Sequence, residues 1–262
     1  MHTLSAAFLQ KLVAYLDNEN TVGIALAGSY ARDEGNLYSD VDLWHYLRSE
    51  PAGGFEITRL EYIDCYLVSI KATQVEKDHA ALRTPKQAIW AVPGIRQAQI
   101  LVDKDGALAT LWEAAWNFRW DSLQVAGDTF ASSHLGGTAE EIYKILDGLA
   151  RKNEAKTLYA IWSLSQEMAD ALLVQRGVLI PTENAFIDLA QTTAGKSSRW
   201  TQQFRLAIGL DPLPNDRPAF ISYGIAGLRL YRETVSLLQE IIRPADAPLV
   251  RRALEVIQEA GY

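Results

Sequence analysis

In the first part of the chain, hydrophobic residues recur at the spacing of a helix in one segment and at the spacing of strands in the segments after it. Apolar side chains over 4–16 recur at helical spacing, which predicts an amphipathic helix. The continuous apolar run 22–27 predicts a short buried strand that ends at Gly28. A second apolar run reaches Leu47 and alternates with polar residues at its start, which predicts a second strand.

Two further segments have the pattern of strands. Residues 55–70 alternate as a long strand or a hairpin, after a turn at 50–54. On a continuous strand, Leu60, Tyr62, Asp64, Tyr66 and Val68 would share one face. The run 97–102 predicts another strand, closed by a turn at 103–106, and the more polar stretch 73–90 between them predicts a helix and a loop.

Residues after Leu108 have the pattern of helices only. Trp112, Trp116 and Trp120 recur every four residues and predict an aromatic stripe on one helix, placed in a core, in a domain interface or against a substrate. Residues 132–138 predict a loop that ends in a capping box at Thr138. Longer helices are expected over 153–176, 182–194, 221–243 and 247–260.

These patterns predict an α+β protein of two domains. Residues 1–110 would form a mixed sheet with flanking helices, and residues 111–262 an all-helical bundle. The boundary is expected within 106–128. A chain of 262 residues is long for one compact domain and comfortable for two.

Composition narrows the class of protein. Hydrophobic residues make up 48% of the chain, which is enough for a globular core. The net charge of −7 disfavours a nucleic-acid partner, because binding to nucleic acid needs basic patches. Cys65 is the one cysteine, so no intramolecular disulfide forms, and no apolar run has the roughly 20 residues of a membrane span. We therefore expect a cytoplasmic protein that does not enter a membrane; whether it is a monomer or a homodimer stays open.

Two aspartates at the start of the second strand are candidates for a metal site. Asp40 and Asp42 would share one strand face, with Cα atoms about 6.6 Å apart. Like charges this close repel unless a cation or a proton intervenes, and magnesium takes oxygen ligands at about 2.0–2.1 Å. The alternative is that both mark the solvent-facing side of an edge strand.

Gly28 and Ser29 follow the first strand directly. A glycine here would let backbone N–H groups approach phosphate oxygens, and the Ser29 hydroxyl would add a donor. The alternative is that Gly28 only ends a strand in a turn.

Gly28-Ser29, then Ser39-Asp40 and Asp42 on a strand, together resemble the signature of the polymerase-beta-like nucleotidyltransferases. The sequence is most similar to the small lincosamide and aminoglycoside nucleotidyltransferases of that superfamily. The resemblance implies that Gly28, Ser29 and Ser39 bind the nucleotide and that Asp40 and Asp42 bind Mg²⁺. Asp33 is a departure, because many relatives have glycine there.

Asp64 is the candidate for a third carboxylate. It interrupts an apolar and aromatic face, where an unpaired charge is costly. The resemblance implies a third acid on a neighbouring strand, acting as a metal ligand, as the base that deprotonates the acceptor, or as both. The alternatives are an exposed edge or an ion pair with Arg59 or Lys71.

The helical half is expected to supply the second wall of the active-site cleft. The resemblance implies that a charged helix start, here Asn153-Glu154-Ala155-Lys156, faces the nucleotide. Lys156 would then meet the triphosphate. A solvated helix end is the alternative, for Lys156 as for Lys152.

The function expected from the resemblance is magnesium-dependent transfer of a nucleoside monophosphate, AMP from ATP, to a hydroxyl of a small antibiotic-like acceptor, with release of pyrophosphate. Asp40, Asp42 and Asp64 would be its catalytic carboxylates. Two alternatives stay open. One is the same chemistry on a protein or RNA acceptor, and the other is a non-catalytic module that binds a nucleotide or a partner protein.

Overall fold

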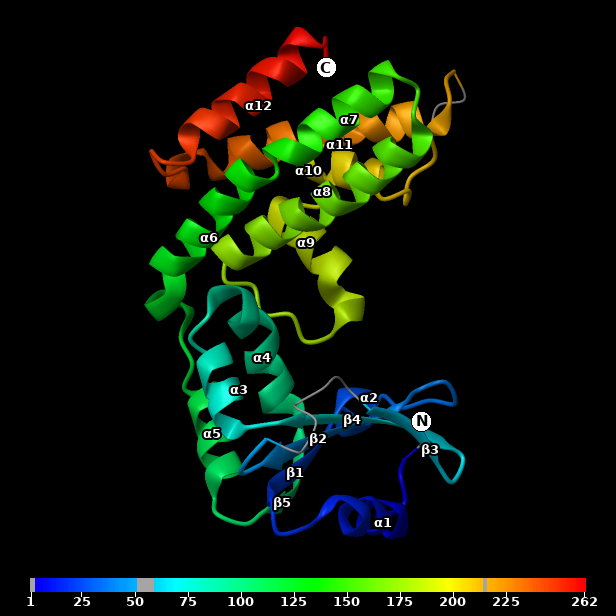
Figure 1. Ribbon diagram of the computed structural model, residues 1–262, viewed down its shortest axis with the longest axis vertical. Helices are drawn as coiled ribbons and strands as arrows, with labels where there is room; N and C mark the ends of the chain where they lie inside the picture. The colour runs from blue at the N-terminus through cyan, green and yellow to red at the C-terminus, as the bar shows by residue number, and fades with distance from the viewer. Residues whose placement is uncertain (1–2, 51–58, 214–215) are drawn as a thin grey trace. The chain divides into compact units, whose positions relative to one another are not determined.

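The computed structural model describes residues 3–50, 59–213 and 216–262 (Figure 1). The chain divides into two compact units, Met1–Arg119 and Trp120–Tyr262. We call them the sheet unit and the helical unit. The first contains a five-stranded sheet with helices and the second is helical, so the α+β class is confirmed. The division between Arg119 and Trp120 lies within the predicted boundary region.

The sheet of the first unit is mixed. Its strands lie in the order β3-β4-β2-β1-β5, and only the β2–β4 pair is parallel. Every residue of β1 is buried, as its continuous apolar run predicts. The strands are β1 Thr21–Ala27, β2 Val41–Leu47, β3 Arg59–Ile63, β4 Tyr66–Thr73 and β5 Gln99–Asp103.

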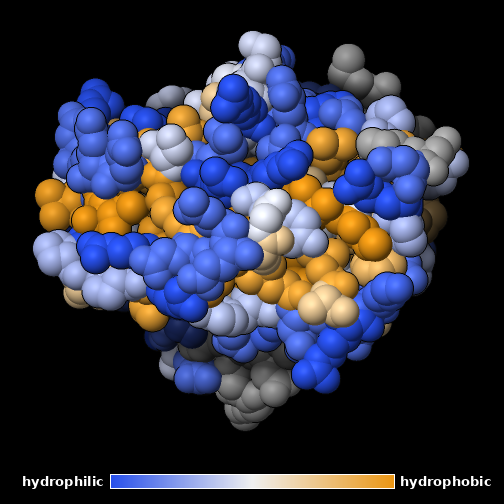
Figure 2. Space-filling view, turned by 90° about the horizontal axis from the view of Figure 1, so that it is seen from above, coloured by the Kyte–Doolittle hydropathy of each residue, from blue (hydrophilic) through white to orange (hydrophobic). Residues whose placement is uncertain are grey.

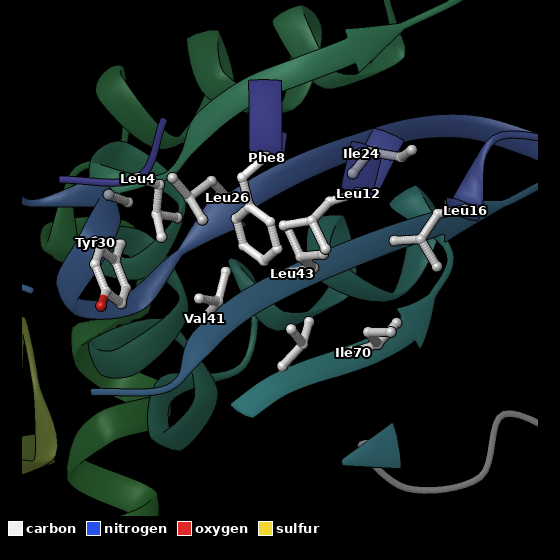
Figure 3. Packing of buried hydrophobic residues seen from close by; sticks show 12 residues of the cluster. Leu4, Phe8, Leu12, Leu16, Ile24, Leu26, Tyr30, Val41, Leu43 and Ile70 are labelled. Atoms are coloured by element: carbon white, nitrogen blue, oxygen red, sulfur yellow. The ribbon is translucent and has the colours of Figure 1, made fainter. Parts of the chain in front are cut away.

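Helix α1, Ala6–Leu16, covers one face of this sheet. Its side chains Phe8, Leu12 and Leu16 are buried among apolar residues of β1, β2 and β4 (Figure 3). The residues of the strands that face α1 are Ile24, Leu26, Val41, Leu43, Val68 and Ile70. Because successive strand residues point to opposite faces, Asp42 and Ser69 lie on the other face.

Three helices cover the other face, namely α3 Val75–Ala81, α4 Pro85–Gln97 and α5 Ala107–Trp116. The Tyr46 hydroxyl donates a hydrogen bond of 2.7 Å to Asp78 on α3, and burial raises the pKa of Tyr46. Trp44 lies beneath Gly94 of α4. These contacts cover the later part of β2, while Asp42 lies near its beginning.

The segment predicted as a long strand or a hairpin is a hairpin over the residues that the structure describes. Residues 51–58, which include most of the turn predicted at 50–54, lie outside the described residues. Asp64 and Cys65 form its turn, and Ile63 pairs with Tyr66. This turn changes which residues share a face. Tyr62 pairs with Leu67, so the expectation that Tyr62 shares a face with Tyr66 is wrong.

The helical unit contains the predicted long helices. Helix α8 spans most of the segment predicted at 153–176, and Asn153 caps it by accepting a hydrogen bond from the Lys156 N–H. The α-helices are α6 Gln124–Gly137, α7 Ala139–Ala150, α8 Glu154–Gln175, α9 Phe186–Ala194, α10 Arg199–Ala207, α11 Ala219–Leu238 and α12 Ala247–Glu259. Short 3₁₀ helices occupy Trp120–Leu123, Glu183–Ala185 and Gln239–Ile241.

Three local predictions in the second half of the chain are wrong. The loop expected at 132–138 lies within α6, where Gly136 packs closely against Asp246 and Leu249. The Thr138 hydroxyl donates to the carbonyl of His134, so it does not cap α7. Helix α5 ends at Trp116 and Trp120 starts a 3₁₀ helix, so the three tryptophans do not form a stripe on one helix.

Hydrophobic residues also reach the surface of the protein. On the face shown in Figure 2 they lie in bands between hydrophilic residues. Among the described residues, no helix is long and apolar enough to cross a membrane.

The packing of α1 on the sheet predicts a large effect of one substitution. Leu12 is fully buried and Leu37 is 74% exposed. Leu12→Ala should lower the free energy of unfolding by about 2–5 kcal/mol, because it leaves a cavity under α1. Leu37→Ala is the matched control and should change it by less than about 0.5 kcal/mol. Urea denaturation measures both, and equal small losses would contradict the packing described.

Candidate functional site

The turn after β1 is held against β2 by a contact that only glycine allows. Gly28 starts the four-residue helix α2, Gly28–Ala31, and has a φ of +66°. The space that a Cβ atom would need at residue 28 is filled by Oδ2 of Asp42. Glycine is therefore required at residue 28 for two reasons: the backbone has a positive φ, and the Asp42 carboxylate leaves no room for a Cβ atom.

Asp42 is placed by the sheet. It lies on β2 opposite Ala27, the last residue of β1, and is partly buried. Strand β2 is paired on both sides, with β1 and with β4, so it is not an edge strand. The alternative in which Asp40 and Asp42 mark the exposed face of an edge strand is therefore wrong.

Asp40 lies just before β2 and is also partly buried. The preceding segment is a tight turn: the Ser39 hydroxyl oxygen accepts a hydrogen bond of 3.1 Å from the Asn36 N–H. The side chain of Asn36 accepts another from the Tyr38 N–H. Ser39 thus has a structural role in shaping the chain that leads to Asp40.

The turn that follows α2 has the shape that a glycine would favour. The Ser29 carbonyl accepts hydrogen bonds from the N–H groups of Arg32 and Glu34. Asp33 lies between them with a φ of +58°, in the left-handed region. The departure from the family pattern at Asp33 is therefore accommodated in the same backbone conformation that glycine adopts most easily.

Asp64 lies elsewhere than predicted. It is in the turn between β3 and β4, with a φ of +54°, and not within a strand. Its carboxylate accepts a hydrogen bond of 2.5 Å from Nζ of Lys11, which lies on α1. Helix α1 packs on the face of the sheet opposite to Asp42. Asp64 thus forms an ion pair, as the alternative expected, but its partner is Lys11 and not Arg59 or Lys71.

The strand next to Asp42 has a serine at the matching position. Ser69 of β4 pairs directly with Asp42 in the parallel register and lies on the same face. Lys71 follows it on that face, with its Nζ 5.7 Å from the centre of the Trp44 ring. The sequence does not reveal this neighbour, because the pairing of β2 with β4 joins segments that are far apart in the chain.

The three carboxylates expected at this site do not come together. Among the described residues, no three His, Cys, Asp or Glu side chains are grouped so that they could hold a metal ion together. The structure therefore does not bring Asp64 together with Asp40 and Asp42, and the three-carboxylate arrangement expected from the sequence is wrong. Asp42 is the carboxylate that the structure places against the Gly28 turn, and carboxylate oxygens suit a hard cation.

Lys156, the candidate for the helical half, already has a partner. Its Nζ lies 2.7 Å from Oδ2 of Asp147, and Oδ1 of Asp147 also accepts from Arg151. These two cations lower the pKa of Asp147. Lys156 would have to leave this pair to meet a triphosphate. Its role toward a nucleotide stays a prediction.

Comparisons with known proteins find similarity in structure but not in sequence. No protein-family model matches the chain, and no curated protein matches it. A solved nucleotidyltransferase-like protein from Exiguobacterium sibiricum 255-15 is similar at a TM-score of 0.49 and 13% identity. The similarity covers 97% of this chain and 79% of the other. A likeness at this level assigns neither a family nor an activity to the chain.

The close approach at residue 28 predicts different costs for two glycine substitutions. Gly28 and Gly106 both have positive φ, but a Cβ at residue 106 would meet no atom within 4 Å. Gly106→Ala should therefore cost only the backbone strain, about 1–2 kcal/mol. Gly28→Ala should cost more, since it must also displace the Asp42 carboxylate. Denaturant unfolding of both variants measures the difference, and equal costs would show that Asp42 does not fill this space.

Proposed function

We propose that the chain is a nucleotidyltransferase whose site is built on Asp40, Asp42 and the turn at Gly28-Ser29. The observation that carries the proposal is the contact of the Asp42 carboxylate with Gly28. Two parts of the sequence motif come together there because β1 pairs with β2, although eleven residues or more separate them along the chain. If Gly28 only ended a strand in a turn, no carboxylate would have to occupy the position of its missing Cβ atom.

The donor groups of this site fit a magnesium ion bound with a nucleotide. Carboxylate oxygens are the ligands that magnesium prefers, and it commonly uses one or two of them together with substrate phosphates. Asp40 and Asp42 would hold the ion, which when bound neutralises charge on the phosphates. Glycine adopts the positive φ of residue 28 without steric cost, and a glycine at this turn would let backbone N–H groups approach a phosphate oxygen.

We propose ATP as the donor and a small hydroxyl-bearing molecule, of the antibiotic-like kind, as the acceptor. The hydroxyl oxygen would bond to the α-phosphorus and its proton would pass to solvent water, while the bond from the α-phosphorus to the bridging oxygen breaks and pyrophosphate leaves. Asp40 and Asp42 would position the phosphates for this in-line displacement. The net charge of −7 favours such an acceptor over RNA. The antibiotic-like acceptor rests on the sequence resemblance alone.

A second candidate function is nucleotide binding without transfer. Ser69 occupies the position on β4 opposite Asp42, and Asp64 is held by Lys11 on α1. The resemblance implies a third acid on a neighbouring strand, and serine is not a base at neutral pH. The two candidates share the binding of a metal–nucleotide complex and differ only in the release of pyrophosphate.

Two aspartate substitutions test the site. Asp42→Asn should weaken ATP binding in the presence of magnesium at least tenfold, because one charged metal ligand is lost. This loss corresponds to roughly 1.4 kcal/mol or more of binding free energy. Asp64→Asn is the matched control: it removes an exposed ion pair worth about 1 kcal/mol or less to stability and should leave ATP binding unchanged. Isothermal titration calorimetry measures both. If Asp64→Asn weakens binding as much as Asp42→Asn, the site is not the two-carboxylate site proposed.

Pyrophosphate release then separates the two candidate functions. The wild-type protein is incubated with ATP, magnesium and panels of aminoglycosides, lincosamides, protein and RNA acceptors. Release that depends on an acceptor and is lost in Asp42→Asn supports transfer. Binding without release under any of these conditions supports the binding module, and absence of ATP binding to the wild type refutes both.

A further inference from the structure

A pocket in the helical unit gathers three arginines. It is lined by Arg199 and Gln203 of α10 and by Arg229, Arg232 and Glu233 of α11, and has a volume of about 240 Å³. Arg199 and Gln203 are one helical turn apart, as are Arg229 and Glu233, so each helix presents its residues on one face. Every residue of the pocket belongs to the helical unit.

The two helices that carry this pocket are fixed to each other by buried contacts. The indole N–H of Trp200, next to Arg199, donates a hydrogen bond of 2.8 Å to the Thr234 hydroxyl, next to Glu233. The Trp200 ring stacks on Phe204 with centroids 4.8 Å apart. The backbone positions from which the arginines extend are therefore rigid, which lowers the cost of ordering their side chains around a ligand.

The charge of the pocket is not neutralised within it. Over the described residues, neither Arg199 nor Arg229 forms a salt bridge, whereas Arg205 on the same helix is paired with Asp211. Arg232 donates one hydrogen bond of 2.8 Å to the carbonyl of Tyr262. Three arginines against one glutamate leave a local positive charge in a chain whose net charge is −7. Such a concentration of charge attracts anions.

Gln203 adds a second, independent observation. Its Oε1 atom is buried and has no hydrogen-bond partner. A buried acceptor without a donor costs free energy, and rotation of the Gln203 amide toward a ligand hydroxyl in the pocket would recover it. Gln203 and Arg229 also line an adjoining pocket of about 210 Å³, with Leu206, Ile225 and Ala226 among its walls. The two pockets therefore share Gln203 and Arg229 in their walls.

We propose that this pocket binds a phosphorylated small molecule that carries hydroxyl groups. The phosphate would lie between Arg199 and Arg229, whose planar guanidinium groups match its oxygens with paired N–H donors. Arg232 contributes the donors that Tyr262 does not use, and the Gln203 amide rotates so that its Oε1 accepts a hydrogen bond from a ligand hydroxyl. The site is separate from Asp40 and Asp42, which lie in the other unit, and needs no metal ion.

Calorimetry with ribose 5-phosphate tests the proposal. The titrations use Asp42→Asn protein in EDTA, so that neither a metal ion nor the first site contributes. Ribose 5-phosphate should bind, ribose should not, and gluconate, a carboxylate with similar hydroxyls, should bind more weakly. Arg199→Gln and Arg229→Gln should each weaken binding roughly tenfold or more, the effect of losing a hydrogen bond between charged groups.

Arg252→Gln is the matched control. Arg252 is an exposed arginine of α12 that is paired with Glu255 and Glu259, outside the pocket, so its loss should leave binding unchanged. Thermal denaturation checks that the variants remain folded. Equal binding of ribose 5-phosphate to Arg229→Gln and to Arg252→Gln would overturn the proposal, as would binding of gluconate as tight as that of ribose 5-phosphate.

Discussion

The candidate site of the sheet unit depends on one close approach, between the carboxylate of Asp42 and the backbone of Gly28. It exists because β1 and β2 pair up to Ala27 and Asp42, and because residue 28 has no Cβ. The carboxylate therefore lies at the end of β1, where the chain turns into α2. A cation bound here would stabilise this partly buried charge.

Much of the fold could be predicted from the sequence, because it depends on local patterns. The apolar run of β1, the helical spacing of α1 and the alternation at the start of β2 each indicate one element without reference to the rest of the chain. The glycine-serine turn and the two aspartates are local patterns of the same kind. Their meeting in space follows from the antiparallel pairing of adjacent strands, which a short connection favours.

The predictions that failed depended on contacts between distant segments or on a single turn. A two-residue turn at Asp64 and Cys65 alters which residues of β3 and β4 share a face, and no alternation pattern shows it. Lys11 is more than fifty residues from Asp64, so its ion pair could not be predicted. Gly136 and Gly137 are typical loop residues, yet α6 continues through them, with Gly136 packed closely against Asp246.

The position of a bound metal ion tests the central claim most directly. Crystals grown with Mn²⁺ and a non-hydrolysable ATP analogue would show the ion in an anomalous difference map. The account predicts one or more peaks within about 2.0–2.4 Å of carboxylate oxygens of Asp40 and Asp42, beside Gly28, with Asp64 still paired to Lys11. An ion with Asp64 among its ligands, or one bound away from Asp42, would contradict it.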